Sequence, residues 1–270
     1  MRALWTAASG MIAQQKSVDT ISNNIANINT TGYKKETAQF KTLLYQTVQE
    51  QSTNANGSVK PLGIQIGLGV KNSAIVSQYK QGAMMETGND FDFAIQGNGF
   101  FMVGMGDGTV GYTRNGSFGI SIGNEGLTLA TAEGFPVLDT TGQPIVFDEN
   151  LASNLIEVDE DGMFMYPDEN NVLQPLDMQI GLAAFNNPAG LQKSSSSILM
   201  ETAASGAARL ESQDDNLRKS SLKSRYLEGS NVQSASEMVD LISTQRAYEM
   251  SSKAITAADE MMQQANNLRR

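Results

Sequence analysis

The sequence predicts an α+β protein in which two long helices, one at each end of the chain, pair as a coiled-coil-like bundle, with an inserted antiparallel all-β domain and an extended arm. Apolar residues recur every seven positions near both ends, which is the repeat of helices that pack along one narrow seam. Between the ends, short apolar runs alternate with glycine-containing turn dipeptides, as in antiparallel sheets.

The N-terminal helix is expected over residues 1–32. Its main apolar row, with residues seven positions apart, is Leu4, Met11, Val18 and Ile25. The row three positions later is Ala7, Gln14, Ile21 and Ile28. Only Gln14 is polar among these positions, so the pattern favours a helix with a single seam against a partner helix over a helix lying on a broad sheet.

The C-terminal helix is expected over residues 231–270, a stretch without Gly or Pro. Its seven-residue row is Leu241, Tyr248, Ile255 and Met262, and a second row beside it is Ala247, Ala254, Met261 and Leu268. Ser234 followed by Glu237 predicts a capping box at the start of the helix. The helices are expected to pair either within one monomer or between subunits. The many Ala, Ser and Gln side chains favour contacts between subunits, because further helices can approach them closely.

Three segments connect the helices. Residues 33–89 are expected to form an extended arm and linker with edge strands, since residues 44–69 are rich in Gln, Ser, Asn and Gly. Residues 90–200 are expected to form the all-β domain, because turn dipeptides such as Asn115-Gly116 and Thr141-Gly142 separate short apolar runs there. Residues 201–230 are expected to be the return linker to the C-terminal helix.

Composition excludes several functional classes. The chain has no Cys and no His, which removes thiolate nucleophiles, imidazole bases and the usual zinc ligands. The formal net charge of -10 opposes binding to nucleic acid or to an anionic membrane surface. Most of this charge lies in residues 51–210, which suggests a centre that faces solvent. No uninterrupted apolar run is long enough for a membrane span, and Thr6, Ser9 and Gly10 interrupt the apolar region that a cleaved signal peptide needs.

The candidate chemical motifs have simpler structural explanations. The segment Asp159-Glu160-Asp161-Gly162 leads into a strand and lacks the late Glu of an EF-hand, so an acidic hairpin turn is expected. Gly97-Asn98-Gly99 lacks the third glycine of a dinucleotide-binding loop. Asp90 and Asp92 are a carboxylate pair of the kind that glycosidases use, but no partner residue is positioned by the sequence. We therefore predict no catalytic residue, no metal ligand and no cofactor.

Four segments of the chain carry a resemblance. They are residues 21–34 (ISNNIANINTTGYK), 96–101 (QGNGFF), 112–118 (YTRNGSF) and 237–250 (EMVDLISTQRAYEM). In this order they resemble the signature motifs of the flagellar rod, hook and hook-associated protein family, over nearly the whole chain. Asparagines among the apolar residues of the first segment can bond to backbone or to neighbouring subunits, and Gly32 is expected to stop the helix.

The resemblance implies a structural subunit of the flagellar basal body and not an enzyme. Family members of this kind are exported through the flagellar type III apparatus without a cleaved signal peptide and polymerise into a helical tube that transmits torque. Residues 1–11 and the chain length are most similar to the distal rod members, and residues 46–63 correspond in place to a rigidifying insert. The implied partners are further copies of the chain, proximal rod proteins, the hook protein, the export apparatus and surrounding rings, with no nucleic acid and no membrane insertion.

The expected assembly interface lies on the terminal helices. It comprises Leu4, Met11, Val18, Ile21, Asn24, Ile25, Asn27, Ile28, Leu241, Tyr248, Ile255 and Met262. Three alternatives stay open: a proximal rod or hook-type subunit of the same family, a cell-surface binding module whose β domain holds a ligand, and an enzyme that uses Asp90 and Asp92.

Overall fold

The computed structural model describes residues 2–49, 64–123, 126–148, 155–168, 172–194, 197–214 and 218–268. The chain forms two compact units. Unit 1 consists of residues 1–26, 36–77 and 233–270, and unit 2 of residues 27–35 and 78–232. Helices at the two ends and β structure between them confirm the α+β class.

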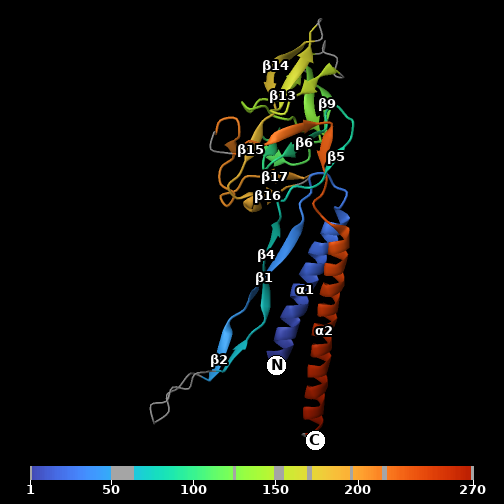
Figure 1. Cartoon of the computed structure of the whole chain (residues 1–270). Coiled ribbons are helices and arrows are strands. Elements are labelled where there is room, and N and C mark those ends of the chain that lie inside the picture. The colour runs from blue at the N-terminus through green and yellow to red at the C-terminus, as the bar shows by residue number, and fades with distance from the viewer. Residues whose placement is uncertain are drawn as a thin grey trace. The chain divides into compact units, whose positions relative to one another are not determined.

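Two helices run side by side in unit 1 (Figure 1): α1 (Arg2–Ala26) and α2 (Ser234–Asn267). They are antiparallel, so the ends marked N and C lie at the same end of this unit. The helix expected over residues 1–32 ends at Ala26, and residues 27–32 form turns in which Asn27 O accepts a hydrogen bond from Thr30 N. The predicted capping box is absent, because Gln233 is the N-cap and makes no side-chain capping bond.

A two-stranded ribbon completes unit 1. The strands β1 (Glu36–Thr42) and β4 (Val70–Ser77) pair antiparallel, and the ribbon continues as β2 (Tyr45–Gln49) paired with β3 (Ile64–Gly67). Ser9 on α1 holds the start of β4, because its Oγ accepts a hydrogen bond from Val70 N at 3.3 Å. The arm expected from the sequence is therefore built of strands, and residues 50–63 of the expected insert lie outside the described residues.

Unit 2 is built from short antiparallel strands. They are β5 (Met84–Glu86), β6 (Phe93–Gln96), β7 (Phe100–Gly104), β8 (Val110–Thr113), β9 (Phe118–Gly123), β10 (Gly126–Thr131), β11 (Val146–Phe147), β12 (Glu157–Val158), β13 (Met163–Pro167), β14 (Leu173–Gln179), β15 (Leu182–Ala184), β16 (Gln192–Lys193), β17 (Ile198–Met200), β18 (Arg209–Leu210), β19 (Ser221–Ser224) and β20 (Tyr226–Glu228). The largest sheet has the order β16-β17-β8-β7-β15-β18. Two three-stranded sheets, β11-β10-β9 and β12-β13-β14, accompany it.

The segment expected to be a return linker, residues 201–230, carries three of these strands. β18 pairs with β15, β19 with β6, and β20 with β5. Each strand in this segment pairs its backbone N–H and C=O groups with those of a strand earlier in the chain. The segment is therefore part of the β unit, a role that its polar composition concealed.

Two hydrophobic clusters form the core of unit 2, and β7 lies between them. Phe101 belongs to the cluster that contains Phe93 and Phe164, whereas Phe100 and Met102 belong to the other. Successive side chains of a strand point to opposite faces, so one apolar run supplies both clusters. This explains why residues 100–103 are continuously apolar and do not alternate with polar residues.

Candidate assembly surfaces

The contact between α1 and α2 has small and polar side chains at its centre. Asn24 donates from Nδ2 to Glu237 Oε2 at 3.0 Å, and near the other end a Cβ added to Gly10 would lie 3.5 Å from Ser251 Oγ. The buried side chains of the two helices are Ala13, Thr20, Ile21, Asn24, Glu237, Thr244 and Ala258. Such side chains allow two helices to approach closely but bury little apolar surface.

Asn24 also fixes the start of the ribbon. Its Oδ1 accepts a hydrogen bond from Glu36 N and its Nδ2 donates to Glu36 O, each at 2.8 Å. One buried amide therefore ties together α1, β1 and α2 within unit 1. The asparagine-rich motif of residues 21–34 predicted Asn24 as an interface residue, and the structure places it in the interior of the subunit.

The other expected interface residues are less buried. Ile21 is buried, whereas Leu4, Met11, Val18, Ile25, Asn27, Ile28, Leu241 and Ile255 are half-buried and Tyr248 and Met262 are exposed. Asn27 and Ile28 belong to unit 2. Most of the large apolar side chains of these rows thus keep accessible surface within one subunit.

Helix α2 carries a second apolar stripe that no described residue covers. Val239, Ile242, Met250 and Met261 lie along it at helical spacing, with the side chains of Arg246 and Lys253 between them, and Val239 and Met250 are 66% and 65% exposed. At 3.6 residues per turn, this stripe lies roughly 150° around the helix from the face that contacts α1. Apolar side chains that a subunit leaves exposed on one face of a helix mark a surface that a further neighbour can cover.

In unit 2, a buried carboxylate holds two buried cations. Lys34 Nζ donates to Glu228 Oε1 at 2.6 Å, and Arg114 Nη1 donates to Glu228 Oε2 at 3.2 Å. Gly82 N donates to the same Oε1 at 2.8 Å, and Arg114 Nη2 donates to Gly97 O at 2.7 Å. Both charged pairs lie in the interior, where they are little screened.

The electrostatics of this cluster follow from burial. Desolvation lowers the pKa of Lys34 and of Arg114, because removal from water disfavours the charged form. The carboxylate of Glu228 acts in the opposite direction on both cations. Glu228 is therefore the main group that makes burial of the two cations tolerable, and its removal would take away their common counter-charge.

The sequence predicted that Gly32 stops the helix, but α1 already ends at Ala26. Gly32 instead allows a close backbone contact. It has φ of +69°, and a Cβ at this position would lie 2.7 Å from Arg114 C and from Asn115 N. Its N–H donates to Glu228 O at 2.8 Å. Only glycine fits both this dihedral angle and this approach.

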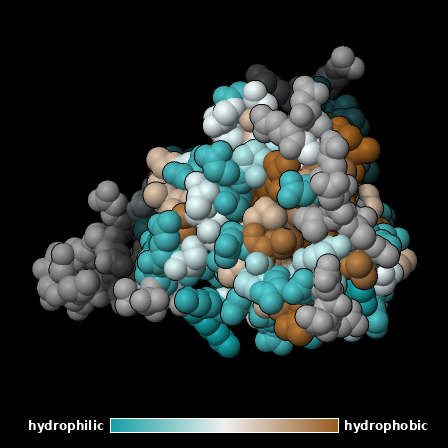
Figure 2. All heavy atoms as spheres, turned by 90° about the horizontal axis from the view of Figure 1, so that it is seen from above, coloured by the Kyte–Doolittle hydropathy of each residue, from teal (hydrophilic) through white to brown (hydrophobic). Residues whose placement is uncertain are grey.

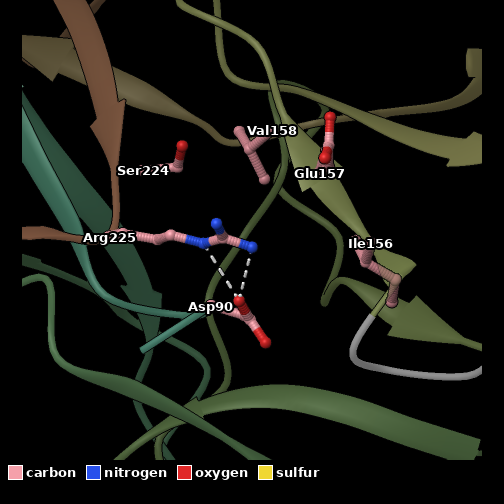
Figure 3. A pocket seen from close by; sticks show the side chains of 6 residues that line it. All are labelled: Asp90, Ile156, Glu157, Val158, Ser224 and Arg225. Carbon is pink, nitrogen blue, oxygen red and sulfur yellow. Dashed lines mark hydrogen bonds and ion pairs between the residues drawn. The ribbon is translucent and has the colours of Figure 1, made fainter. Parts of the chain in front are cut away.

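The two carboxylates of the enzyme hypothesis do not both line the cavity at Asp90. Asp90 lines a small cavity of about 170 Å³ and pairs with Arg225, whose guanidinium turns toward it (Figure 3). Asp92 is buried, accepts a hydrogen bond from Asn89 Nδ2 at 3.0 Å, and is not among the residues that line this cavity.

On the face shown in Figure 2, hydrophobic side chains form separate groups between hydrophilic ones.

Comparisons with known proteins agree along the whole chain. Residues 4–34 match the family "Flagella basal body rod protein", residues 94–166 match "Flagellar hook protein FlgE/F/G D1 domain", and residues 223–268 match "Flagellar basal body rod FlgEFG protein C-terminal". The "Flagellar basal-body rod protein FlgG" of Borreliella burgdorferi is 44% identical over 100% of this chain and 99% of its own length. The proteins of that name from Caulobacter vibrioides and Bacillus subtilis are 40% and 36% identical, each over 100% of both chains.

The chain belongs to the flagellar basal-body rod protein family.

In this rod-family chain, three of the four family-like motifs contribute residues to the buried cluster of unit 2. Lys34 ends the first motif, Gly97 lies in the second and Arg114 in the third, and these residues meet in the buried cluster of unit 2. The fourth motif, residues 237–250, lies on α2 in unit 1. Sequence reasoning missed Glu228, because it lies outside the four motifs and only the fold brings it to its cations.

Two further findings concern the described part of this rod-family chain. No three acidic side chains among the described residues lie close enough together to hold a metal ion. Neither α1 nor α2 combines the length and the hydropathy that crossing a lipid bilayer requires.

Proposed function

We propose that this protein is a structural subunit of the distal rod of the flagellar basal body, which polymerises through α1 and α2 into a helical tube that transmits motor torque to the hook. The observation that carries this proposal is the second apolar stripe of α2. Each subunit buries one face of α2 on its own α1 and leaves the opposite face for a neighbour. Family membership supports a role in the flagellum. The exposed stripe supports polymerisation, because a neighbouring subunit can cover it.

The twelve interface residues take two roles in this proposal. Ile21 and Asn24 hold the subunit's own helix pair. The half-buried rows, such as Leu4, Met11 and Val18, complete a coiled-coil-like packing when helices of other copies are added. Isolated helices of this kind are marginal without tertiary burial, so assembly would stabilise them as it covers them.

The remaining parts of the proposal follow from the family. The copies would be exported through the flagellar type III apparatus without a cleaved signal peptide, join proximal rod proteins at one end and the hook protein at the other, and lie within surrounding rings. The acidic central segment, residues 51–210, would face outward from the tube, and the ribbon of unit 1 would stiffen it. No step of this role calls for a cofactor or a catalytic group.

The proposal is tested by placing a charge on either helix row. Ile25→Asp or Leu241→Asp is expected to abolish tube formation and motility, because an unpaired carboxylate would enter an apolar contact. The thermal unfolding of unit 2 is expected to stay unchanged, since neither residue belongs to that unit. Electron microscopy of purified hook-basal bodies would show a missing distal rod in cells that lack the protein. Motility with either variant would contradict the proposal.

A further inference from the structure

Methionine is the side chain of this protein that a hydroperoxide oxidises most readily. The chain has no cysteine, so no thiolate competes for the oxidant. Oxidation of a thioether requires that the oxidant reach the sulfur atom, so exposed methionines react before buried ones. The position of the exposed methionines therefore decides which surface of the molecule an oxidant changes.

The exposed methionines are concentrated on α2. Among the described residues of this helix, they are Met238, Met250, Met261 and Met262. Met250 and Met261 are the most exposed of them, at 65% and 63%, and both lie on the apolar stripe described above. In unit 2, Met85 on β5 is exposed, whereas Met102 lies in the core and is 6% exposed. An oxidant in solution thus reaches the stripe of α2 long before it reaches the core of unit 2.

Oxidation of Met250 changes the chemistry of the stripe. The O–O bond of hydrogen peroxide breaks, one oxygen forms a bond to the thioether sulfur, and the other leaves as water. The sulfur loses two electrons and the peroxide gains them, and the product is a polar sulfoxide. Arg246 and Lys253 are exposed and lie four positions before and three positions after Met250, so they share its helix face and can donate hydrogen bonds to the new oxygen. An apolar position of the stripe becomes a hydrated polar one.

We propose that Met250 and Met261 are oxidation sites for hydroperoxides, and that sulfoxides at these positions stop a second copy from covering α2. This inference rests on the proposed function and adds a means of regulating the same surface. A neighbour that packs on the stripe would have to bury the sulfoxide oxygen and remove its water, which costs free energy that an apolar contact does not return.

The same geometry separates free copies from assembled ones. In a free copy, the sulfur atoms of Met250 and Met261 are accessible to the oxidant. In a tube, the neighbour that covers the stripe also covers these atoms. Oxidation therefore stops the addition of new copies and spares those already assembled. Methionine sulfoxide reductases reverse the change, because one enzyme reduces each sulfoxide epimer.

Peptide mass spectrometry after brief treatment with hydrogen peroxide tests the sites themselves. In the full-length monomer, Met250 and Met261 are expected to be oxidised at least several-fold faster than Met102. In assembled tubes, the oxidation rate of Met250 is expected to fall several-fold. Oxidation of Met250 no faster than that of Met102 in the monomer would overturn the inference. Equal rates for Met250 in monomer and tube would instead contradict the covering of the stripe, on which the proposed function depends.

Tube growth from treated monomer tests the consequence, with each protein compared with its own untreated sample. The wild-type chain is expected to lose growth several-fold and to regain it after treatment with both reductases. The double variant Met250→Leu and Met261→Leu is expected to keep most of its own rate, because leucine has a similar volume but no sulfur. Met85→Leu is the matched control, since it removes an exposed methionine outside the stripe, and it is expected to lose growth as the wild type does.

The two failures are distinguishable. Equal fractional losses of growth in the double variant and in Met85→Leu would overturn the inference and leave the proposed function intact. Full growth of a wild-type sample in which Met250 and Met261 are oxidised would also overturn it. An untreated wild-type chain that forms no tube under any condition would contradict the proposed function.

Discussion

The two units of this protein differ in what their interiors contain. In unit 2, large side chains such as Phe93, Phe101 and Phe164 are completely buried, and the buried charge of Glu228 is met by two cations. In unit 1, the buried side chains of α1 and α2 are small or polar apart from Ile21, while Val239 and Met250 remain in solvent. One unit has its hydrophobic core inside the subunit, and the other leaves much of its apolar surface outside.

This difference indicates two kinds of stability. Hydrophobic burial is roughly proportional to the apolar area removed from water, so unit 2 gains most of its stability within one chain. In the proposed function, unit 1 would gain part of its stability only when another copy covers α2. Assembly would then complete the ends of a subunit whose centre is already folded. Four substitutions would test this difference between the two units.

The largest effect is expected from Glu228→Ala. It leaves Lys34 and Arg114 buried without their common partner, and breaking a buried pair in this way costs about 3–5 kcal/mol. Denaturant unfolding of the full chain, followed by a signal from the β unit, would measure it. A cost below about 1 kcal/mol would mean that the two cations find other partners.

Gly32→Ala is expected to cost about 1–3 kcal/mol, the usual range for a strained backbone conformation, with a further cost from the collision at Arg114 and Asn115. The same unfolding measurement applies. Gly88→Ala is the matched control, since Gly88 also has a positive φ, of +75°, but a Cβ there meets nothing within 4 Å. An equal cost at both positions would assign the whole effect to the dihedral angle.

Asn24→Ala is expected to destabilise unit 1 alone, by about 1–3 kcal/mol, since buried groups that Asn24 bonds at Glu36 and Glu237 lose their partner. Helical circular dichroism would melt at a lower temperature, while the unfolding of unit 2 would not change. A parallel loss in unit 2 would show that the two units unfold together.

The smallest effect is expected from Asp90→Asn. The pair with Arg225 is largely accessible to solvent, with the Arg225 side chain 54% exposed, so its loss costs about 0–1 kcal/mol. The variant serves as the matched control for Glu228→Ala, because both remove a carboxylate that faces arginine. A large cost here would mean that exposure does not separate the two pairs.

The sequence predicted the parts of this fold that depend on local pattern. The heptads of residues 4–28 and 241–262 predicted both helices, and the turn dipeptides predicted the β unit between them. The sequence did not predict where α1 ends, because Gly32 has the residue type of a helix stop. The role of Gly32 is instead set by its close approach to Arg114 and Asn115, which lie far along the chain.

The buried cluster shows the same limit. Lys34, Gly97 and Arg114 were visible as residues of three motifs, but nothing in their spacing indicated that they share the carboxylate of Glu228. The polar composition of residues 201–230 predicts a linker, although their backbones close three strand pairs. Interactions between distant segments decide all of these features, and local periodicity does not report them.

Hydrogen exchange of the full-length monomer and of the assembled tube would show whether unit 1 depends on a second copy for its stability. In the monomer, amides of α1 and α2 are expected to exchange much faster than those of β7 and β8, and in the tube the helix amides are expected to become protected. Equal and strong protection of the helices and of β7 and β8 in the monomer would contradict the account, because unit 1 would then be complete without a second copy.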